Sequence, residues 1–264
     1  MSRRFRSVAP VLVVLAAAAA CSAPQIPFVR GDHVVLVGNA LADRMQHDGW
    51  LEAHLQSELP DLQLVIRNQG FAGDRIDHRP RVKGSLVDRD DGPPGPGFPS
   101  ADEYLAFSQA DVVVAMFGYN ESFDGEPAQF ADALMEWIDH TRAQDYSGRG
   151  APRIVLVSPI AHENLDDASL PDGRENNARL AAYAEAMATV ARQERVRYVD
   201  LFGPSQELYR AAASPLTING IHLNSDGNRR VAEVIVASLL GRAPTADPER
   251  VEAGRSAVLD KNWH

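Results

Sequence analysis

Two short segments, far apart in the chain, could together form a site, and the second carries a side chain suited to acid–base chemistry. The first is Gly38-Asn39-Ala40, which follows the apolar run at 33–37, and the second is Asn219-Gly220-Ile221-His222. An imidazole is the side chain that most often acts as a general base, and a neighbouring amide can hold its ring by a hydrogen bond. We therefore predict that Asn219 and His222 share one site with the turn at 38–40.

The elements that must bring these segments together are short apolar runs that alternate with amphipathic stretches. The runs lie at 33–37, 62–66, 111–117, 153–157 and 196–199. Apolar residues at helical spacing occupy 130–138, 180–190 and 231–239, with Pro127 suited to a first helical turn and Asn224 or Ser225 to a cap. Continuous apolar runs are typical of parallel strands covered on both faces. The pattern predicts a three-layer, doubly wound (flavodoxin-like) α/β fold with a parallel sheet of about five strands.

In such a sheet, ligands bind at the carboxyl ends of the strands. Several polar or small residues follow the predicted strands and are further candidates for the site: Gly70, Gly118, Asn120, Glu121, Ser122, Ser158 and His162. Each also has a purely structural interpretation. Gly70 would be a turn glycine, Asn120 a loop cap and His162 a solvated histidine.

Length and composition predict one folded domain with flanking segments. The chain has 264 residues, of which 45% are hydrophobic and 23% charged, which suits a single α/β domain. We assign this domain to 32–241, a tether to 21–31 and a polar tail with at most a short helix to 242–264. The Pro- and Gly-rich segment 88–100 is predicted to be a loop.

The N-terminus has the organisation of an export signal. Arg3, Arg4 and Arg6 precede an apolar stretch at 8–20, which is too short to span a bilayer, and small residues precede Cys21. This boundary resembles a bacterial lipobox, with Ala18 in place of the commoner leucine. The resemblance implies removal of 1–20, a lipid on Cys21 and a membrane anchor facing the periplasm or the cell exterior. Because Cys21 is the only cysteine, it excludes a disulfide within the chain.

Charge and motif content exclude several functions. The formal net charge is −10, and it becomes −13 without the three arginines of the signal, which argues against nucleic acid as a ligand. The sequence contains neither a glycine-rich dinucleotide fingerprint nor metal-ligand spacing. We expect no cofactor and no metal.

The ordered set of motifs resembles the SGNH (GDSL-like) hydrolase family across 32–241. The family has four blocks: G-D-S, a glycine after the second strand, G-x-N-D, and D-x-x-H before the last helix. Gly70, the pair Gly118 and Asn120, and His222 match the later blocks. The phrases N-E-S-F-D-G, S-P-I-A-H-E and N-G-I-H-L look like an exported subgroup from planctomycete-type bacteria. The resemblance implies an ester hydrolase acting on acyl or acetyl groups, with carbohydrate esters among the expected substrates.

The chain departs from the family pattern where the covalent chemistry would occur. Ala40 stands at the position of the nucleophilic serine, Asn39 at the aspartate before it, and Asn219 at the aspartate of D-x-x-H. An asparagine can orient the imidazole but cannot stabilise an imidazolium by charge, a change that costs about 10⁴ in rate in a well-studied triad. Ser122 and Ser158 lie at strand ends but not at the family's nucleophile position.

The resemblance also implies an oxyanion site, formed by the Gly70 amide and the Asn120 side chain. We predict Asn39, Gly118, Glu121 and His162 as further binding residues, and His162, with Glu163 beside it, is a second candidate base. Three hypotheses follow. The protein is an ester hydrolase in which His222 activates water, a degenerate domain that binds a glycan or acyl ligand without turnover, or an interaction module of the cell envelope. Whether it is an enzyme is left open by the sequence.

Overall fold

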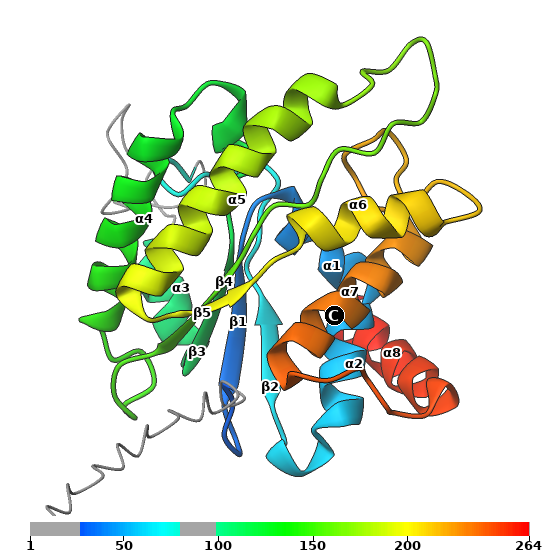
Figure 1. Cartoon of the computed structure of the whole chain (residues 1–264). Helices are drawn as coiled ribbons and strands as arrows, with labels where there is room; N and C mark the ends of the chain where they lie inside the picture. The colour runs from blue at the N-terminus through cyan, green and yellow to red at the C-terminus, as the bar shows by residue number, and fades with distance from the viewer. Residues whose placement is uncertain (1–26, 80–98, 264) are drawn as a thin grey trace, which may run out of the picture.

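The computed structural model describes residues 27–79 and 99–263 (Figure 1). The predictions for the signal at 1–20 and for Cys21, and nearly all of the loop at 88–100, lie outside the described residues. The strands are β1 (His33–Gly38), β2 (Val65–Asn68), β3 (Val112–Met116), β4 (Arg153–Val157) and β5 (Arg197–Val199). The helices are α1 (Ala40–Asp48), α2 (Trp50–Glu58), α3 (Ala101–Phe107), α4 (Pro127–Arg142), α5 (Arg174–Glu194), α6 (Phe202–Ala211), α7 (Ser225–Leu240) and α8 (Pro248–Trp263), with short 3₁₀ turns at Pro60–Leu62 and Glu121–Phe123.

The five strands form one parallel sheet in the order β2-β1-β3-β4-β5. This confirms the predicted doubly wound α/β fold. The second strand begins three residues later than predicted, because Pro60-Asp61-Leu62 form a 3₁₀ turn before it. The chain leaves β1 toward β2 on one side and reaches β3 on the other, so the carboxyl ends of β1 and β3 flank the point where the strand order reverses.

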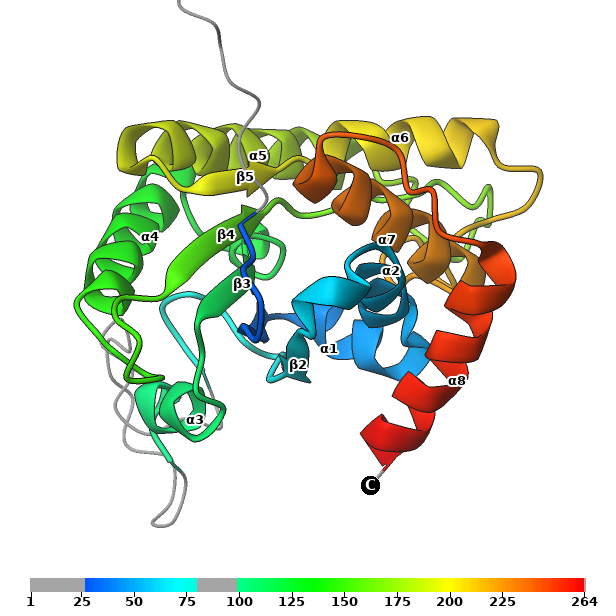
Figure 2. The ribbon, with the colours of Figure 1, turned by 90° about the horizontal axis from the view of Figure 1, so that it is seen from below.

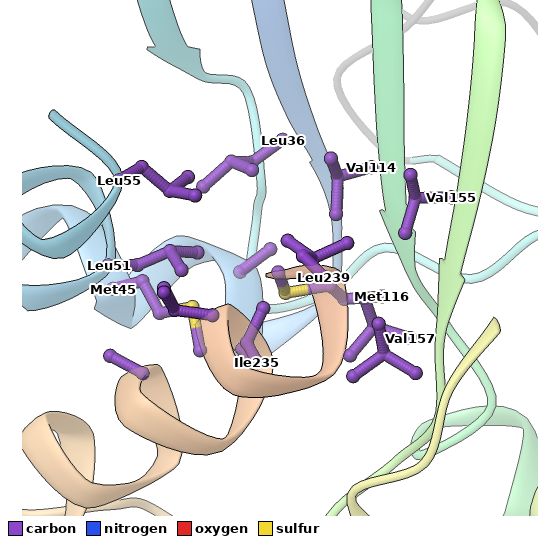
Figure 3. Close-up of a cluster of buried hydrophobic side chains, with 14 of the residues drawn as sticks. Leu36, Met45, Leu51, Leu55, Val114, Met116, Val155, Val157, Ile235 and Leu239 are labelled. Carbon is purple, nitrogen blue, oxygen red and sulfur yellow. The ribbon is translucent and has the colours of Figure 1, made fainter. Parts of the chain in front are cut away.

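Helices cover both faces of the sheet (Figure 2). Alternate residues of each strand point to opposite faces, so Leu36, Val114 and Val155 contact α1, α2 and α7 in one core cluster (Figure 3). Val35, Val113 and Ile154 belong to the other cluster, which is formed with α3, α4 and α5. Burial on both faces explains why the strands are continuously apolar.

The ends of the helices follow local sequence. Pro127 occupies the first turn of α4, where a missing N–H costs nothing, and the Asn224 side chain caps α7 by accepting from the Gly227 amide at 2.9 Å. The nine-residue helices α1 and α2 were not predicted. They meet at Gly49, which adopts a left-handed conformation with φ of 70° and so permits a sharp turn between them.

The C-terminal segment differs from the prediction of a polar tail with at most a short helix. Residues Pro248–Trp263 form the 16-residue helix α8, which packs against α2. Its buried side chains are Val251 and Val258, 3% and 7% exposed. Two buried valines seven residues apart are too few to produce a recognisable helical pattern of apolar residues in a polar sequence. They nevertheless pack α8 against α2.

In the part of the chain that the structure describes, no helix combines the length and apolar character required to cross a membrane.

The core cluster between α7 and the sheet is expected to contribute much of the free energy of unfolding. Leu239 is 1% exposed in that cluster, so Leu239→Ala should lower the free energy of unfolding by about 2–5 kcal/mol through lost burial and a residual cavity. Urea denaturation followed by circular dichroism measures the change. Phe107→Ala is the control, since this side chain is 89% exposed on α3. Equal losses in the two variants would contradict the packing described.

Candidate functional site

A pocket of about 220 Å³ opens at the carboxyl ends of the central strands. Its walls come from the turn after β1, the loops after β3 and β4, and the loop before α7. Of the sequence-predicted residues, the structure brings Asn39, Ala40, Asn120 and His222 together around this pocket. Most of the remaining lining is apolar, including Leu41, Met116, Phe117, Ile160 and Leu223.

The turn from β1 into α1 forms the floor of the pocket. Gly38 has φ of 138°, and a Cβ atom there would lie 2.3 Å from the Met116 carbonyl oxygen, so only glycine fits. The next residue, Asn39, caps α1 by accepting from the Leu41 amide at 3.4 Å. Ala40 then begins the helix and lines the pocket with only a methyl group.

His222 is held by Asn219 on the opposite wall. The ring nitrogen Nδ1 lies 3.2 Å from the Asn219 Oδ1 atom and 3.1 Å from its Nδ2 atom, while Oδ1 also accepts from the His222 amide at 2.9 Å. Nε2 is the ring nitrogen left for a ligand. Burial, and then the Arg44 guanidinium, hold the pKa of His222 below its usual value. The imidazole is therefore neutral at pH 7.

Glu163 fixes the loop that carries His222, a role that sequence reasoning missed. Its buried carboxylate accepts from the Leu216 amide and from both the amide and the hydroxyl of Thr217, at 2.6–3.1 Å. Thr217 also forms an isolated bridge to Leu223, which closes the loop. A glutamate directly after His162, in the loop that follows β4, was a visible signal, but its partners lie 53 and 54 residues away.

The two predicted oxyanion donors are engaged in internal hydrogen bonds. The Asn120 Nδ2 atom donates to the carbonyls of Ala72 and Asp74, at 2.9 and 3.0 Å. The Gly70 amide donates to the Asn68 side chain at 2.8 Å, and Gly70 lines a neighbouring pocket. A Cβ atom on Gly70 would lie 2.6 Å from that of Ala42. Gly70 is thus required for close packing against α1, and Asn120 for closing the loop after β2.

Gly118 and Glu121 lie outside the pocket and hold the loop that carries Asn120. The buried Glu121 carboxylate accepts from the Ile76 amide at 2.7 Å and from the Gly118 amide at 2.8 Å. Burial raises the pKa of Glu121 to about 7, although the two amides oppose the shift. Glu121 does not line the pocket that contains His222. It joins the loops after β2 and β3 and so holds Asn120 in place.

His162 is neither solvated nor part of the pocket wall. The residue is 3% exposed, and its Nδ1 atom lies 2.8 Å from the Asn176 side-chain nitrogen. Gly173 and Gly220 pack so tightly on the ring that a Cβ atom on either would clash with it. Burial lowers the pKa of His162, consistent with a neutral ring that packs the loop carrying His222.

Neither alternative serine hydroxyl is available as a nucleophile in this structure. Ser158 lines the pocket, but its hydroxyl accepts from the Leu201 and Phe202 amides at 2.8 and 3.2 Å. The Ser122 hydroxyl is buried and donates to the Tyr119 carbonyl at 2.7 Å. The pocket thus offers a neutral imidazole and amide groups, and the hydroxyl of its serine, Ser158, is engaged in internal hydrogen bonds.

Arg44, Tyr119 and Asn228 complete the polar lining, and none of the three was predicted from the sequence. Arg44 lies one helical turn after Ala40 on α1, a spacing that places both on the same face of the helix. The Tyr119 hydroxyl is buried, and burial raises the pKa of Tyr119 well above its usual value, so the hydroxyl remains protonated. The spacing of Arg44 was the available signal. Among the described residues, no cluster of ligating side chains is suited to a metal ion.

Comparisons with known proteins agree with this geometry. The chain matches the GDSL-like Lipase/Acylhydrolase family over residues 17–230. A catalytic mutant of the acetylxylan esterase Axe2 from Geobacillus stearothermophilus superposes with a TM-score of 0.61 at 16% identity, covering 84% of this chain and 99% of that one.

Two further solved structures have the same fold. LAE5, an alpha/beta hydrolase from the metagenome of Lake Arreo, gives a TM-score of 0.55 at 20% identity, covering 81% of this chain and 98% of that one. The gut microbial diltiazem-metabolizing enzyme BT4096 gives 0.59 at 18% identity, covering 82% and 49%. No curated protein matches the chain significantly. At these identities, the three structures establish the fold alone.

The pairing of His222 with a neutral amide makes its basicity testable. Asn219→Asp places a carboxylate within hydrogen-bonding distance of Nδ1, which should raise the pKa of His222 by about one pH unit or more. Histidine NMR titration measures the midpoint directly. Asn262→Asp, on the exposed face of α8, gives the same change of charge away from the pocket. A His222 midpoint that moved equally in both variants would contradict the described pair.

Proposed function

Because the chain belongs to the GDSL-like lipase/acylhydrolase family, we propose that it is a catalytically degenerate member that binds an acyl or glycan ligand without serine-dependent turnover. Ala40 carries this proposal. It occupies the N-terminus of α1 at the edge of the pocket, with His222 on the same pocket, and among the described residues of the lining the one serine, Ser158, has its hydroxyl engaged in internal hydrogen bonds. An acyl-enzyme requires a nucleophilic atom, and a methyl group has none.

The lining supports a ligand that combines apolar and hydroxylated parts. Leu41, Met116 and Ile160 offer apolar surface for an acyl group. At the rim, Phe123 is 53% exposed, and its ring centroid lies 5.7 Å from that of Tyr119. Exposed aromatic faces suit the apolar face of a sugar ring, and the superposed Axe2 is an acetylxylan esterase. Acetylated oligosaccharides are therefore a preferred ligand class.

One observation favours a second candidate, direct hydrolysis of an activated ester by water. Asn219 holds Nδ1 of His222, which leaves Nε2 to accept a proton from a bound water molecule. Asn219 supplies no charge to stabilise the resulting imidazolium, and the lowered pKa of His222 weakens it as a base. Any such reaction would be slow.

The proposed location is the outer side of a membrane. Residues 1–20 have the composition of an export signal, and Cys21 follows small residues as in a lipobox. A lipid on Cys21 would hold the domain at the surface through the short segment that precedes β1. Intact-mass measurement of the membrane-extracted protein tests for the acyl mass on Cys21.

Introducing a serine hydroxyl at position 40 and a carboxylate at position 219 should produce ester hydrolysis. The double variant Ala40→Ser with Asn219→Asp should gain hydrolysis of p-nitrophenyl acetate, because it supplies a hydroxyl at α1 and a charge behind His222. Asn219→Asp should account for up to about 10⁴ of the gain in rate, by analogy with a well-studied triad. Initial rates at neutral pH measure it, with Ala40→Ser alone as the matched control.

The unmodified protein should hydrolyse the same ester no faster than its His222→Ala variant. A parent rate that fell at least tenfold in His222→Ala would establish direct hydrolysis and refute binding without turnover. An inactive double variant that still folds would show that the pocket no longer holds an ester in reactive geometry.

A further inference from the structure

The pocket contains buried polar atoms that no protein group satisfies. Among the described residues that line this pocket, the Asn39 Nδ2 atom, the Arg44 Nε atom, the Tyr119 hydroxyl and the Asn228 Oδ1 atom are buried without a hydrogen-bond partner. Asn39 is 2% exposed and Tyr119 is 8% exposed. Unsatisfied buried donors are rare because each costs the desolvation of a polar group. Three of these four groups can donate and one, Asn228 Oδ1, only accepts, so the pocket favours a ligand that mainly accepts hydrogen bonds.

Arg44 adds a positive charge without a counterion. Within the described segments, its guanidinium forms no ion pair or hydrogen bond, whereas Arg229 and Arg230 on α7 both pair with Asp226. The charge reaches the other wall, since Arg44 contributes to lowering the pKa of His222. The chain has a formal net charge of −10, so acidic side chains are plentiful, yet none pairs with Arg44 among the described residues. A positive charge left unpaired beside an apolar pocket lowers the stability of the fold, because the charge loses water without gaining a partner.

The start of α1 favours the same sign of ligand. The first backbone N–H groups of a helix lack intrahelical partners and carry partial positive charge. Asn39 satisfies the Leu41 amide through its Oδ1 atom, which leaves its own Nδ2 as a donor. Ala40 places only a methyl group beside these donors. The space that a serine hydroxyl would occupy is therefore open to an oxygen atom of the ligand.

We propose that the pocket recognises its ligand through a carboxylate, held between Arg44, Asn39 and Tyr119. The inference rests on the proposed function, that this pocket binds a ligand without turning it over. A carboxylate has two oxygens that accept from an arginine and from neighbouring donors at once. A single guanidinium and a mostly apolar lining match a monoanion with an organic body better than a phosphate dianion.

Two classes of compound present such a group, short-chain fatty acids and acidic sugars. Hexanoate and methyl hexanoate form a pair that differs in charge on an acyl chain, and methyl glucuronoside and methyl glucoside form the corresponding pair on a sugar. Isothermal titration of the full chain with all four compounds separates charge recognition from recognition of the body. Arg44→Gln tests the proposed contact. Arg250→Gln, on the exposed surface of α8, is the control with the same change in net charge.

In at least one pair, the acid should bind about tenfold or more tightly than its neutral partner. Arg44→Gln should abolish this preference and Arg250→Gln should preserve it, with unchanged melting temperatures as evidence of folding. Neutral compounds that bind as tightly as the acids, or a preference that persists in Arg44→Gln, would overturn the carboxylate site while leaving the proposed function standing. Absence of binding by all four compounds would overturn both.

Discussion

The close approach of β1 to the end of β3 is the constraint on which the site depends. At Gly38 the chain passes so near the Met116 carbonyl that a Cβ atom would lie 2.3 Å from its oxygen. This contact lets the chain turn directly from β1 into α1 at the point where the strand order reverses. The start of α1, the loops after β3 and β4, and the loop before α7 consequently surround one pocket. Glu163 and Glu121 then fix these loops through buried hydrogen bonds to backbone amides.

Under the proposed function, the same architecture binds a ligand in an apolar pocket without a covalent step. The chain keeps an imidazole oriented by Asn219 and an apolar cavity, while the position of attack holds Ala40. The pocket is also electrostatically different from one that would stabilise an imidazolium. Arg44 opposes a positive charge on His222, and Asn219 cannot support one. Arg44 and Asn219 both favour a neutral histidine, which suits holding an anionic group better than moving a proton.

Much of the fold could be predicted because buried parallel strands and long amphipathic helices leave strong periodic signals. The helices α1 and α2 were missed because nine residues show too few turns. Helix α8 was missed because its buried residues are two valines, and its other contacts are made by polar side chains such as Lys261, which pairs with Glu52. The order of the motifs in the sequence predicted correctly that Ala40, Asn120 and His222 line one pocket. It could not show that the Asn120 amide closes a loop, or that the Gly70 amide donates to Asn68. Such pairings depend on side-chain geometry between distant segments, as does the unpaired state of Arg44.

The central claim is that this pocket holds ligands without a nucleophile, and covalent labelling tests it most directly. A fluorophosphonate ester reacts with activated serine hydroxyls and leaves a phosphonyl adduct that intact-mass spectrometry detects. The account predicts no adduct on the unmodified protein, because the Ser122 and Ser158 hydroxyls are buried in internal hydrogen bonds. A stoichiometric adduct that peptide mapping located on either serine would contradict it.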